Sequence, residues 1–289
     1  MTILGTGLNG LVGSRIAELL KNTYHFESLS RSSGVDISDA RLVEEAVNKS
    51  ASEVVLHFAA KTNVDACEED KKYGKDGEAW KVNVLGTKNI VNACEKSGKK
   101  LIYISTDFIF NGEKDFYTEI DGPDPINWYG MTKCEGESEV QSSSSDWIIM
   151  RIAYPYRSKF EKGDFVRKIQ ERFTNKQEVA GVTDHIFCPT FVDDIAAAIS
   201  NLIKQKATGI YHAVGSESLS PYIAATKIAE TFGFNQKLIS KTTRAEYFKD
   251  KAPRPFHLVL KNDKIEQLNV AMNSFSKGLE LVKSQQATI

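Results

Sequence analysis

The sequence lacks the features that mark several protein classes. Among its 289 residues are only four cysteines, which are far apart and form no CxxC pair: Cys67, Cys94, Cys134 and Cys188. This excludes a disulfide-stapled secreted fold, and we interpret the four as reduced thiols. No apolar run approaches the roughly 18 to 20 residues that span a bilayer. The chain also enters a strand and a glycine turn from residue 1, without room for a signal peptide. We therefore expect a cytoplasmic protein without a membrane segment.

The sequence also has no excess of charge of either sign. The 37 basic and 38 acidic residues leave a net charge of −1, which argues against a nucleic-acid partner. The five histidines show no metal-ligand spacing, so we predict no metal site. Hydrophobic residues at 41% and charged residues at 26% are typical of a soluble globular protein.

A glycine-rich turn occupies residues 5–13. It follows a short apolar strand, and apolar residues then recur at helical spacing up to Leu20. Such a turn lets the backbone approach a pyrophosphate and leads into a helix N-terminus that attracts anions. A GxGxxG motif alone is weak evidence, but its place between a strand and a helix favours dinucleotide binding. The cofactor residues expected here are Gly7, Leu8, Asn9, Gly10 and Gly13.

Strands and helices alternate up to residue 150. Strand patterns occur at 26–30, 54–58, 100–105 and 147–150, and helical patterns at 40–48 and through residues 80–94 lie among them. This alternation predicts right-handed βαβ crossovers and therefore an α/β fold, with a doubly wound (Rossmann-type) parallel sheet covered on both faces. Ligands bind such sheets outside the carboxyl ends of the strands.

The tip of the second strand indicates which nicotinamide cofactor is bound. NAD sites usually carry an acidic residue there, whereas an arginine accommodates the 2′-phosphate of NADP. This sequence has Arg31 and Ser32 and no acid until Asp36. We expect NADPH, and NADH stays open because Arg31 could instead be a solvated turn residue.

After residue 150 the pattern is looser. Helices are predicted at 165–173, 191–203 and 221–232, strands at 179–182 and 209–212, and a polar tail at the C-terminus. No linker separates the halves. We predict that residues 1–150, with part of 177–212, form an NADP-binding Rossmann domain. Residues 151–289 would be mainly a smaller, interwoven substrate-binding lobe.

Tyr129 and Lys133 lie four residues apart, so a helix would place a phenol and an ammonium on one face. Asp124 and Pro125 predict the helix start, as N-cap and first helical residue. A tyrosine and a lysine at this spacing are common by chance, so the pair carries chemistry only together with other segments.

Such segments occur in order along nearly the whole chain. They resemble the extended short-chain dehydrogenase/reductase superfamily and, within it, the dTDP-4-dehydrorhamnose reductases. The matching segments are residues 6–13, 35–37, 59–65 with Glu68, 82–83, 105–112, 129–133 with 136–137, 189–190 and 254–255.

The resemblance implies the roles of four residues. Tyr129 would protonate the substrate carbonyl oxygen while the nicotinamide delivers hydride to the carbonyl carbon. Lys133 would lower the pKa of the phenol and bind the nicotinamide ribose. Thr106 would donate a hydrogen bond to the same oxygen, and Asp107 matches an active-site position without a clear role. Taken alone, Thr106 and Asp107 would be interpreted as a turn in which short polar side chains bond nearby backbone, and the presence of Tyr129 favours the catalytic role instead.

The remaining site residues follow from the same resemblance and from the strand ends. Further cofactor contacts are expected at Asp36, Ile37, Ala59, Ala60 and Lys61, and at the catalytic Tyr129 and Lys133. Substrate contacts are expected at Thr62, Val64, Tyr154 and Arg254. Arg254 would grip a diphosphate, although it could lie in a solvent loop, and Tyr154 could be a core aromatic instead.

The expected reaction is NADPH-dependent reduction of a 4-keto nucleotide sugar, from dTDP-4-dehydro-L-rhamnose to dTDP-L-rhamnose. Phe108 stands where the family's dehydratases have a glutamate, which disfavours dehydration. The sequence departs from the family's pattern at three places. Lys61 stands where the family commonly has a tyrosine, residues 71–78 form a polar insertion, and residues 151–157 differ from the segment usual in the reductases. These departures bear on the identity of the substrate more than on the chemistry. The alternatives are a nucleotide-sugar epimerase, another sugar reductase, or an NADP-binding regulatory subunit like that of methionine adenosyltransferase. A homodimer also stays open.

Overall fold

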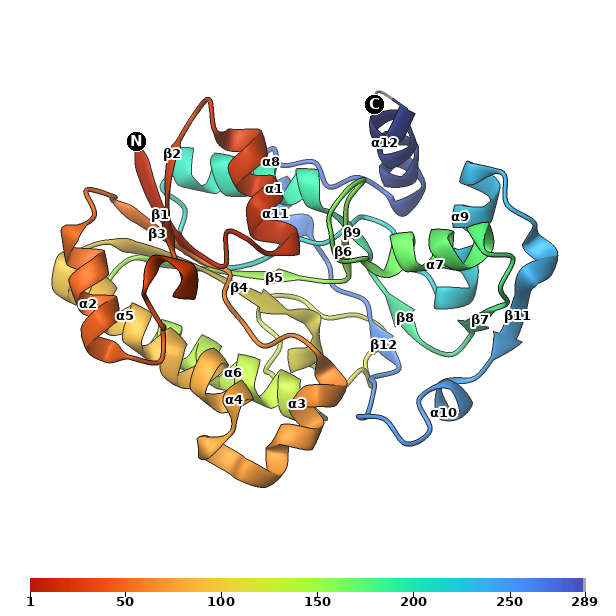
Figure 1. Ribbon diagram of the computed structural model, residues 1–289, viewed down its shortest axis with the longest axis horizontal. Helices are drawn as coiled ribbons and strands as arrows, with labels where there is room; N and C mark the ends of the chain where they lie inside the picture. Colours follow the sequence, from red (N-terminus) through yellow and green to blue (C-terminus); the bar gives the residue numbers. More distant parts are fainter. Residues whose placement is uncertain (288–289) are drawn as a thin grey trace.

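A six-stranded parallel sheet forms the centre of the molecule (Figure 1). The structure, a computed structural model, describes residues 1–287. Across the sheet the strands follow the order β2–β1–β3–β4–β5–β10, and each pairs in parallel with its neighbours. Their bounds are β1 Thr2–Thr6, β2 His25–Leu29, β3 Val54–His57, β4 Lys100–Thr106, β5 Trp147–Ile152 and β10 Gly209–His212. The predicted doubly wound α/β fold is confirmed.

Helices cover both faces of this sheet. One face carries α1 (Leu11–Leu20) and α8 (Val192–Lys204), and the other carries α2 (Ala40–Lys49), α5 (Gly86–Ser97) and α6 (Trp128–Gln141). Successive strand residues point to opposite faces. Ile3 of β1 therefore joins the core beneath α1 and α8, and Leu4 joins the core beneath α2 and α5. Each such buried side chain stabilises the fold by roughly 1.5–3 kcal/mol.

The predicted polar insertion at residues 71–78 projects from the molecule beside α3 (Val64–Asp70) (Figure 1). It forms a 3₁₀ turn at Lys71–Asp76 and leads into α4 (Glu78–Trp80), which continues through a π turn (Lys81–Leu85) into α5. The insertion thus precedes a long helix that runs below the sheet.

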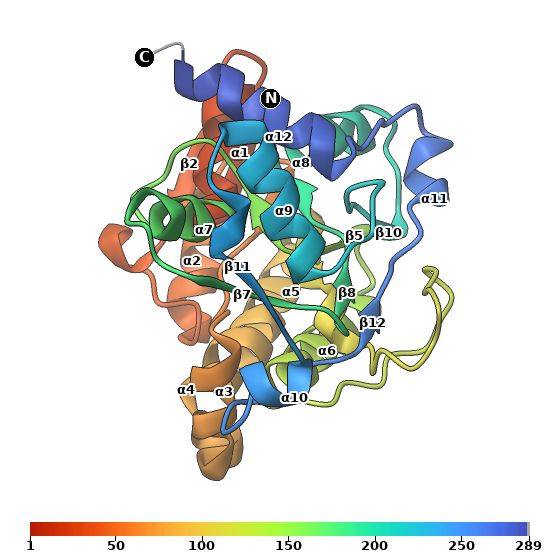
Figure 2. The ribbon, with the colours of Figure 1, turned by 90° about the vertical axis from the view of Figure 1, so that its right-hand side faces the viewer.

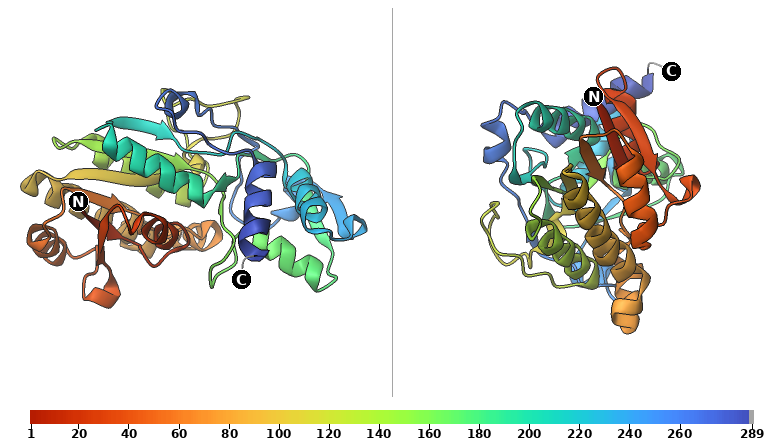
Figure 3. Two further views of the ribbon diagram at one scale, coloured as in Figure 1. Left: turned by 90° about the horizontal axis from the view of Figure 1, so that it is seen from above. Right: turned by 90° about the vertical axis from the view of Figure 1, so that its left-hand side faces the viewer.

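Much of the second half of the chain forms a smaller lobe, which lies beside the sheet in the left view of Figure 3 and faces the viewer in Figure 2. Its core contains α7 (Phe165–Thr174), α9 (Pro221–Phe232), α12 (Phe275–Ala287) and the parallel pair β7 (Val179–Val182) and β11 (Ile239–Thr242). Tyr156, Phe165 and Phe275 pack ring against ring within it. Two short pairs, β6 (Pro155–Tyr156) with β9 (Thr190–Phe191) and β8 (Ile186–Phe187) with β12 (His257–Leu258), lie between this core and the sheet. The chain returns to the sheet at α8 and β10.

Two predictions about helices are wrong. Helix α6 begins at Trp128, not at Asp124 and Pro125, because the Asn127 side chain accepts the N–H of Gly130 at 2.8 Å and caps the helix. The Asp124 carboxylate instead accepts from Asn111. Up to residue 287, the C-terminal segment is not a polar tail either. Its apolar residues recur at i, i+4 and i+7, so α12 buries Phe275, Leu279 and Val282; residues 288–289 lie outside the described part.

Candidate active site

The site lies where the strand order reverses. Strand β2 is on one side of β1 and β3 on the other, which opens a crevice at their carboxyl ends. Two cavities, of about 620 Å³ and 460 Å³, meet there. Gly7, Ala59 and Ala60 line both of them. The predicted cofactor segments after β1 and β3 are therefore neighbours in space.

The glycine turn is shaped for close approach of backbone to backbone. Gly7 has φ +66°, and a Cβ there would lie 2.7 Å from the backbone nitrogen of Ala59. A Cβ on Gly13 would lie 2.5 Å from the carbonyl oxygen of Gly7. Gly10 caps α1 without a side chain, so no side-chain cap takes up the first N–H groups of the helix. This cradle fits a pyrophosphate.

A chain of buried hydrogen bonds holds the loop after β3. The N–H of Ala59 donates to Thr6 Oγ1 at 3.1 Å, and this hydroxyl lies 2.7 Å from His57 Nδ1. His57 Nε2 lies 3.1 Å from Thr87 Oγ1, which donates to the carbonyl of Asn83. Burial lowers the pKa of His57 to about 3, and the nearby Lys133 contributes in the same direction. The imidazole is therefore neutral, and it ties the loop to α5.

The smaller cavity contains most of the residues predicted to bind the adenosine end of the cofactor. Its lining includes Asn9, Arg31, Ser32, Asp36, Ile37 and Lys61. Arg31 pairs with Asp36 at 3.0 Å and Lys61 with Glu78 at 2.5 Å, and both pairs are open to water. Of the predicted cofactor residues, Leu8 alone lines neither cavity, because its side chain packs towards Gly5.

Asn83 also belongs to this site, although we assigned it no role from the sequence. Its side chain accepts the N–H of Lys61 at 2.7 Å and donates to the carbonyl of the same residue at 3.1 Å. It also donates to Thr132 Oγ1 at 2.9 Å. Asn83 therefore fixes the loop after β3 against helix α6.

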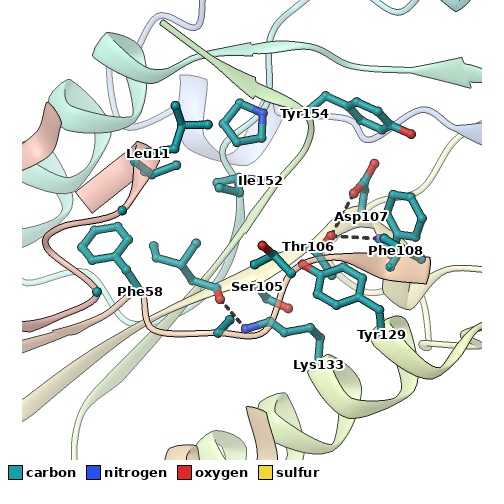
Figure 4. A pocket seen from close by; sticks show the side chains of 18 of the residues that line it. Leu11, Phe58, Ser105, Thr106, Asp107, Phe108, Tyr129, Lys133, Ile152 and Tyr154 are labelled. Atoms are coloured by element: carbon teal, nitrogen blue, oxygen red, sulfur yellow. Dashed lines mark hydrogen bonds between the residues drawn. The ribbon is translucent and has the colours of Figure 1, made fainter. Parts of the chain in front are cut away.

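The larger cavity brings the four predicted catalytic residues together (Figure 4). Thr106 ends β4, Asp107 follows it, and Tyr129 and Lys133 project from the first turns of α6. Thr106 Oγ1 donates to Asp107 Oδ1 at 3.0 Å and accepts the N–H of Phe108 at 3.3 Å. The turn that was the alternative role for Thr106 and Asp107 is thus present, and Thr106 also lines the cavity.

The expectation that Lys133 lowers the pKa of Tyr129 is wrong for this structure. Burial raises the pKa of the phenol; the Thr106 hydroxyl opposes this, and Asp107 adds to it. The Lys133 ammonium donates to the carbonyl of Ile104 at 2.7 Å and lies 4.0 Å from the centre of the Tyr103 ring. Burial lowers its own pKa to about 7, partly offset by Glu137. Because burial raises the pKa of Tyr129, the phenol keeps its proton at neutral pH.

Asp107 is the most confined carboxyl group of the site. It is 1% exposed, and its Oδ2 has no hydrogen-bond partner among the described residues. Burial raises its pKa to about 7, against hydrogen bonds from Thr106 and the backbone. Near neutral pH this carboxyl can therefore either donate or accept a hydrogen bond within the cavity.

Tyr154 lines the same cavity in a strained conformation. Its φ of 41° lies in the left-handed region, which a bulky residue rarely adopts. Its hydroxyl lies 3.0 Å from His185 Nε2, and His185 Nδ1 lies 2.8 Å from the carbonyl of Pro255. Since a carbonyl only accepts, Nδ1 carries the proton and Tyr154 donates to Nε2. Tyr154 is therefore both a packed aromatic and a wall of the cavity.

The expected substrate residues Thr62, Val64 and Arg254 line this cavity too. Arg254 is not in a solvent loop: it is buried and donates to Asp65 at 2.8 Å. No sequence pattern assigned Asp164, Phe165 or Phe248 to the site, and the smaller lobe contributes all three to the cavity lining. Only the tertiary fold brings them to the strand ends.

Residues 1–287 contain no helix that is long and apolar enough to cross a membrane. Within the same range there is no group of three His, Cys, Asp or Glu side chains that could hold a metal ion.

Residues 1–287 match the family model described as the RmlD substrate binding domain. The chain belongs to this family. It is 30% identical over 279 residues to the spore coat polysaccharide biosynthesis protein SpsK of Bacillus subtilis, covering 96% of this chain and 95% of that protein. The resemblance to the extended short-chain dehydrogenase/reductase superfamily and its dTDP-4-dehydrorhamnose reductases is confirmed.

Two further proteins that are similar to this chain bear on its function. A crystal structure of dTDP-4-dehydrorhamnose reductase from Bacillus anthracis, in complex with NADP, superimposes with a TM-score of 0.90 at 28% identity and covers 98% of this chain and 99% of that one. Methionine adenosyltransferase 2 subunit beta of Xenopus tropicalis is 26% identical over 291 residues, covering 93% of this chain and 83% of that protein.

Proposed function

We propose that this protein reduces the 4-keto group of a nucleotide-linked deoxysugar with NADPH, converting dTDP-4-dehydro-L-rhamnose to dTDP-L-rhamnose. One observation carries the proposal: Tyr129, Thr106 and Lys133 meet in a cavity that continues to the glycine turn of a dinucleotide site. The similarity to a dTDP-4-dehydrorhamnose reductase in complex with NADP supports the choice of reaction and cofactor.

The residues present fit the cofactor. The glycine cradle suits the pyrophosphate, and Arg31 with Ser32 suits a 2′-phosphate, since a guanidinium forms strong hydrogen bonds with phosphate oxygens. When bound, NADPH supplies the hydride for the carbonyl carbon. Arg31 would exchange its exposed contact with Asp36 for the phosphate.

The protein's own groups would handle the proton and the carbonyl oxygen. Tyr129 gives its phenolic proton to the oxygen that becomes the product hydroxyl, and a proton from solvent restores the phenol. Its raised pKa keeps it protonated beforehand, as a proton donor requires. Thr106 would turn its single hydroxyl proton from Asp107 to the same oxygen, and Lys133 would bind the nicotinamide ribose. Phe108, whose ring lies edge-on to Tyr129 at 5.8 Å, offers no carboxylate for elimination.

The substrate would lie against the smaller lobe. Tyr154 and Phe165 give the cavity aromatic walls that suit a deoxysugar, and Arg254 supplies a cation for the diphosphate. We further propose that residues 1–150, with part of 177–212, act as the cofactor domain and that the rest of the chain acts mainly as the substrate lobe. The four free cysteines suit the reducing cytoplasm.

The test is a turnover assay with purified protein, NADPH and dTDP-4-dehydro-L-rhamnose. We expect NADPH absorbance to fall in step with formation of dTDP-L-rhamnose. Product formation no faster than in Tyr129→Phe would contradict the proposal.

A regulatory role is the second candidate, because the chain is similar over most of its length to methionine adenosyltransferase 2 subunit beta. NADPH binding without turnover of any keto sugar, together with a stoichiometric partner enzyme, would favour it. Sedimentation of the purified protein would at the same time settle whether it forms a homodimer.

A further inference from the structure

A buried ion pair joins helix α6 to strand β5. Glu137 and Arg151 are 0% and 1% exposed, and two parallel hydrogen bonds join them: Nε to Oε1 at 3.0 Å and Nη2 to Oε2 at 2.8 Å. Arg151 comes from β5, so the pair ties α6 to the sheet. Neither residue lines either cavity.

Arg151 also contacts His212 and Phe110. Its Nη1 lies 3.3 Å from His212 Nε2, and its guanidinium lies 5.2 Å from the centre of the Phe110 ring. His212 Nδ1 lies 2.9 Å from the carbonyl of Lys261, so Nδ1 carries the proton and Nε2 accepts from Arg151. Burial lowers the pKa of His212 to about 3, and Arg151 adds to this effect. The histidine is therefore a neutral acceptor.

The pair lies one helical turn beyond Lys133. Residues four apart on a helix are neighbours, so the Glu137 carboxylate lies on the same face as the Lys133 ammonium. Lys133 is 3% exposed and meets a carbonyl and an aromatic ring, but no carboxylate within ion-pair distance among the described residues. Around it, β3 contributes the neutral His57, β4 contributes Tyr103, and α6 itself contributes Tyr129 and Glu137.

Packing alone gives little reason for this arrangement. A buried ion pair adds little net stability, since the loss of hydration offsets much of the attraction between the charges, and apolar residues of similar volume often replace it without loss. Its anion does have an electrostatic consequence nearby, because it favours the charged form of Lys133 where burial disfavours it.

We propose that Glu137 is a positioning residue for Lys133: held by Arg151, which His212 holds in turn, its carboxylate favours the ammonium form of the buried lysine and fixes the turn of α6 that presents it to the cofactor. The catalytic use of that ammonium rests on the proposed function. The charge of Lys133 does not depend on the proposed function, and it can be measured separately.

The direct test is an NMR titration of protein labelled with ¹³C at the lysine ε carbons, whose shift reports the charge of each lysine. The Lys133 signal is assigned by its loss in Lys133→Arg. Glu137→Gln leaves Arg151 without its partner and so risks unfolding, whereas Glu137→Leu with Arg151→Met removes both charges at similar volume. Glu139→Gln is the matched control, because Glu139 lies two residues further on α6 and pairs with the exposed Lys88.

We expect the titration midpoint of Lys133 to fall by about one pH unit or more in the double variant and to stay unchanged in Glu139→Gln. An unchanged midpoint in a folded double variant overturns the inference. The pH profile of kcat/KM for the keto sugar should follow the same shift, with the loss of activity at high pH beginning at lower pH. If the unaltered protein does not turn over the sugar, the proposed function fails, while the titration still decides the role of Glu137.

Discussion

The two cavities of this protein hold their charged groups in opposite ways. In the smaller one, Arg31 and Lys61 form ion pairs with Asp36 and Glu78 that water reaches. In the larger one, Tyr129, Lys133 and Asp107 are buried and have shifted pKa values. Exposed pairs of charges contribute little and can exchange partners, whereas buried groups are costly and fixed. The smaller cavity is therefore suited to binding a cofactor and releasing it, and the larger one to chemistry.

Removing the phenol from the buried side should have the largest effect. Tyr129→Phe is expected to lower kcat by roughly 10²- to 10⁴-fold, the usual contribution of a general acid, with little change in the affinity for NADPH. Steady-state kinetics and a cofactor titration measure both quantities. Tyr156→Phe is the control, because this phenol is also buried but lines neither cavity. An equal loss in both variants would show a general packing defect and not a lost proton donor.

Thr106→Val should lose one hydrogen bond to the carbonyl oxygen. We expect kcat to fall by roughly 10²-fold, about 3 kcal/mol, because such a donor acts mainly on the transition state. Thr106→Ser keeps the hydroxyl and should retain most of the activity. If the valine and serine variants are equally impaired, the methyl group and not the hydroxyl matters.

Asp107 should make stability depend on pH. Its folded pKa, about 7, exceeds the ordinary value of 3.8, so between these values the folded protein holds a proton that the unfolded chain has released. The free energy of unfolding therefore falls as pH rises from about 4 to 7, by up to roughly 3 kcal/mol from this group.

Asp107→Asn should remove that fall, as urea unfolding at a series of pH values would show. Asp36 in the smaller cavity is the contrast: bonds from Ser38 and Arg31 lower its pKa, so its contribution is present above the ordinary value and is lost as pH falls. An Asp107→Asn protein with the wild-type pH slope would remove the case for a buried, protonated carboxyl group.

A change on the exposed side should have the smallest effect and be selective for the cofactor. Arg31→Ala is expected to raise KM for NADPH about tenfold or more and leave KM for NADH nearly unchanged, since only NADPH carries the 2′-phosphate. Stability should change by less than about 1 kcal/mol, because the lost ion pair is exposed. Equal effects on the two cofactors would place the phosphate elsewhere.

The sequence was most informative where function depends on local pattern. Gly7 and Gly10 lie between β1 and α1, and Gly13 lies in the first turn of α1. The spacing of Tyr129 and Lys133 places both on one helix face, so the structure has these residues where the pattern predicted. The start of α6 was mispredicted because Asp124 and Pro125 match a local helix-start pattern, and such a pattern does not include contacts with residues elsewhere in the chain. The tertiary contacts of Asp124 favoured Asn127.

Other properties depend on contacts between distant parts of the chain. The raised pKa of Tyr129 comes from its burial in a cluster that includes Cys67 of α3, Phe108 after β4 and Leu258 of β12, which no spacing reveals. Phe248 reaches the cavity from a segment far beyond Tyr129 along the chain. From the sequence, Arg254 could bind a diphosphate or lie in a solvent loop, and only its contact with Asp65 shows that it is buried at the site. Burial and long-range contacts are set by the whole fold.

The most direct measurement of the central claim is the fate of a labelled hydride. The protein is given NADPH that carries deuterium at the transferable position, together with dTDP-4-dehydro-L-rhamnose, and the product is analysed by NMR. We predict one deuterium on C4 of the sugar in dTDP-L-rhamnose, with one NADP⁺ formed per product. A product without deuterium at C4, or sugar turnover without net oxidation of NADPH, would contradict carbonyl reduction at Tyr129.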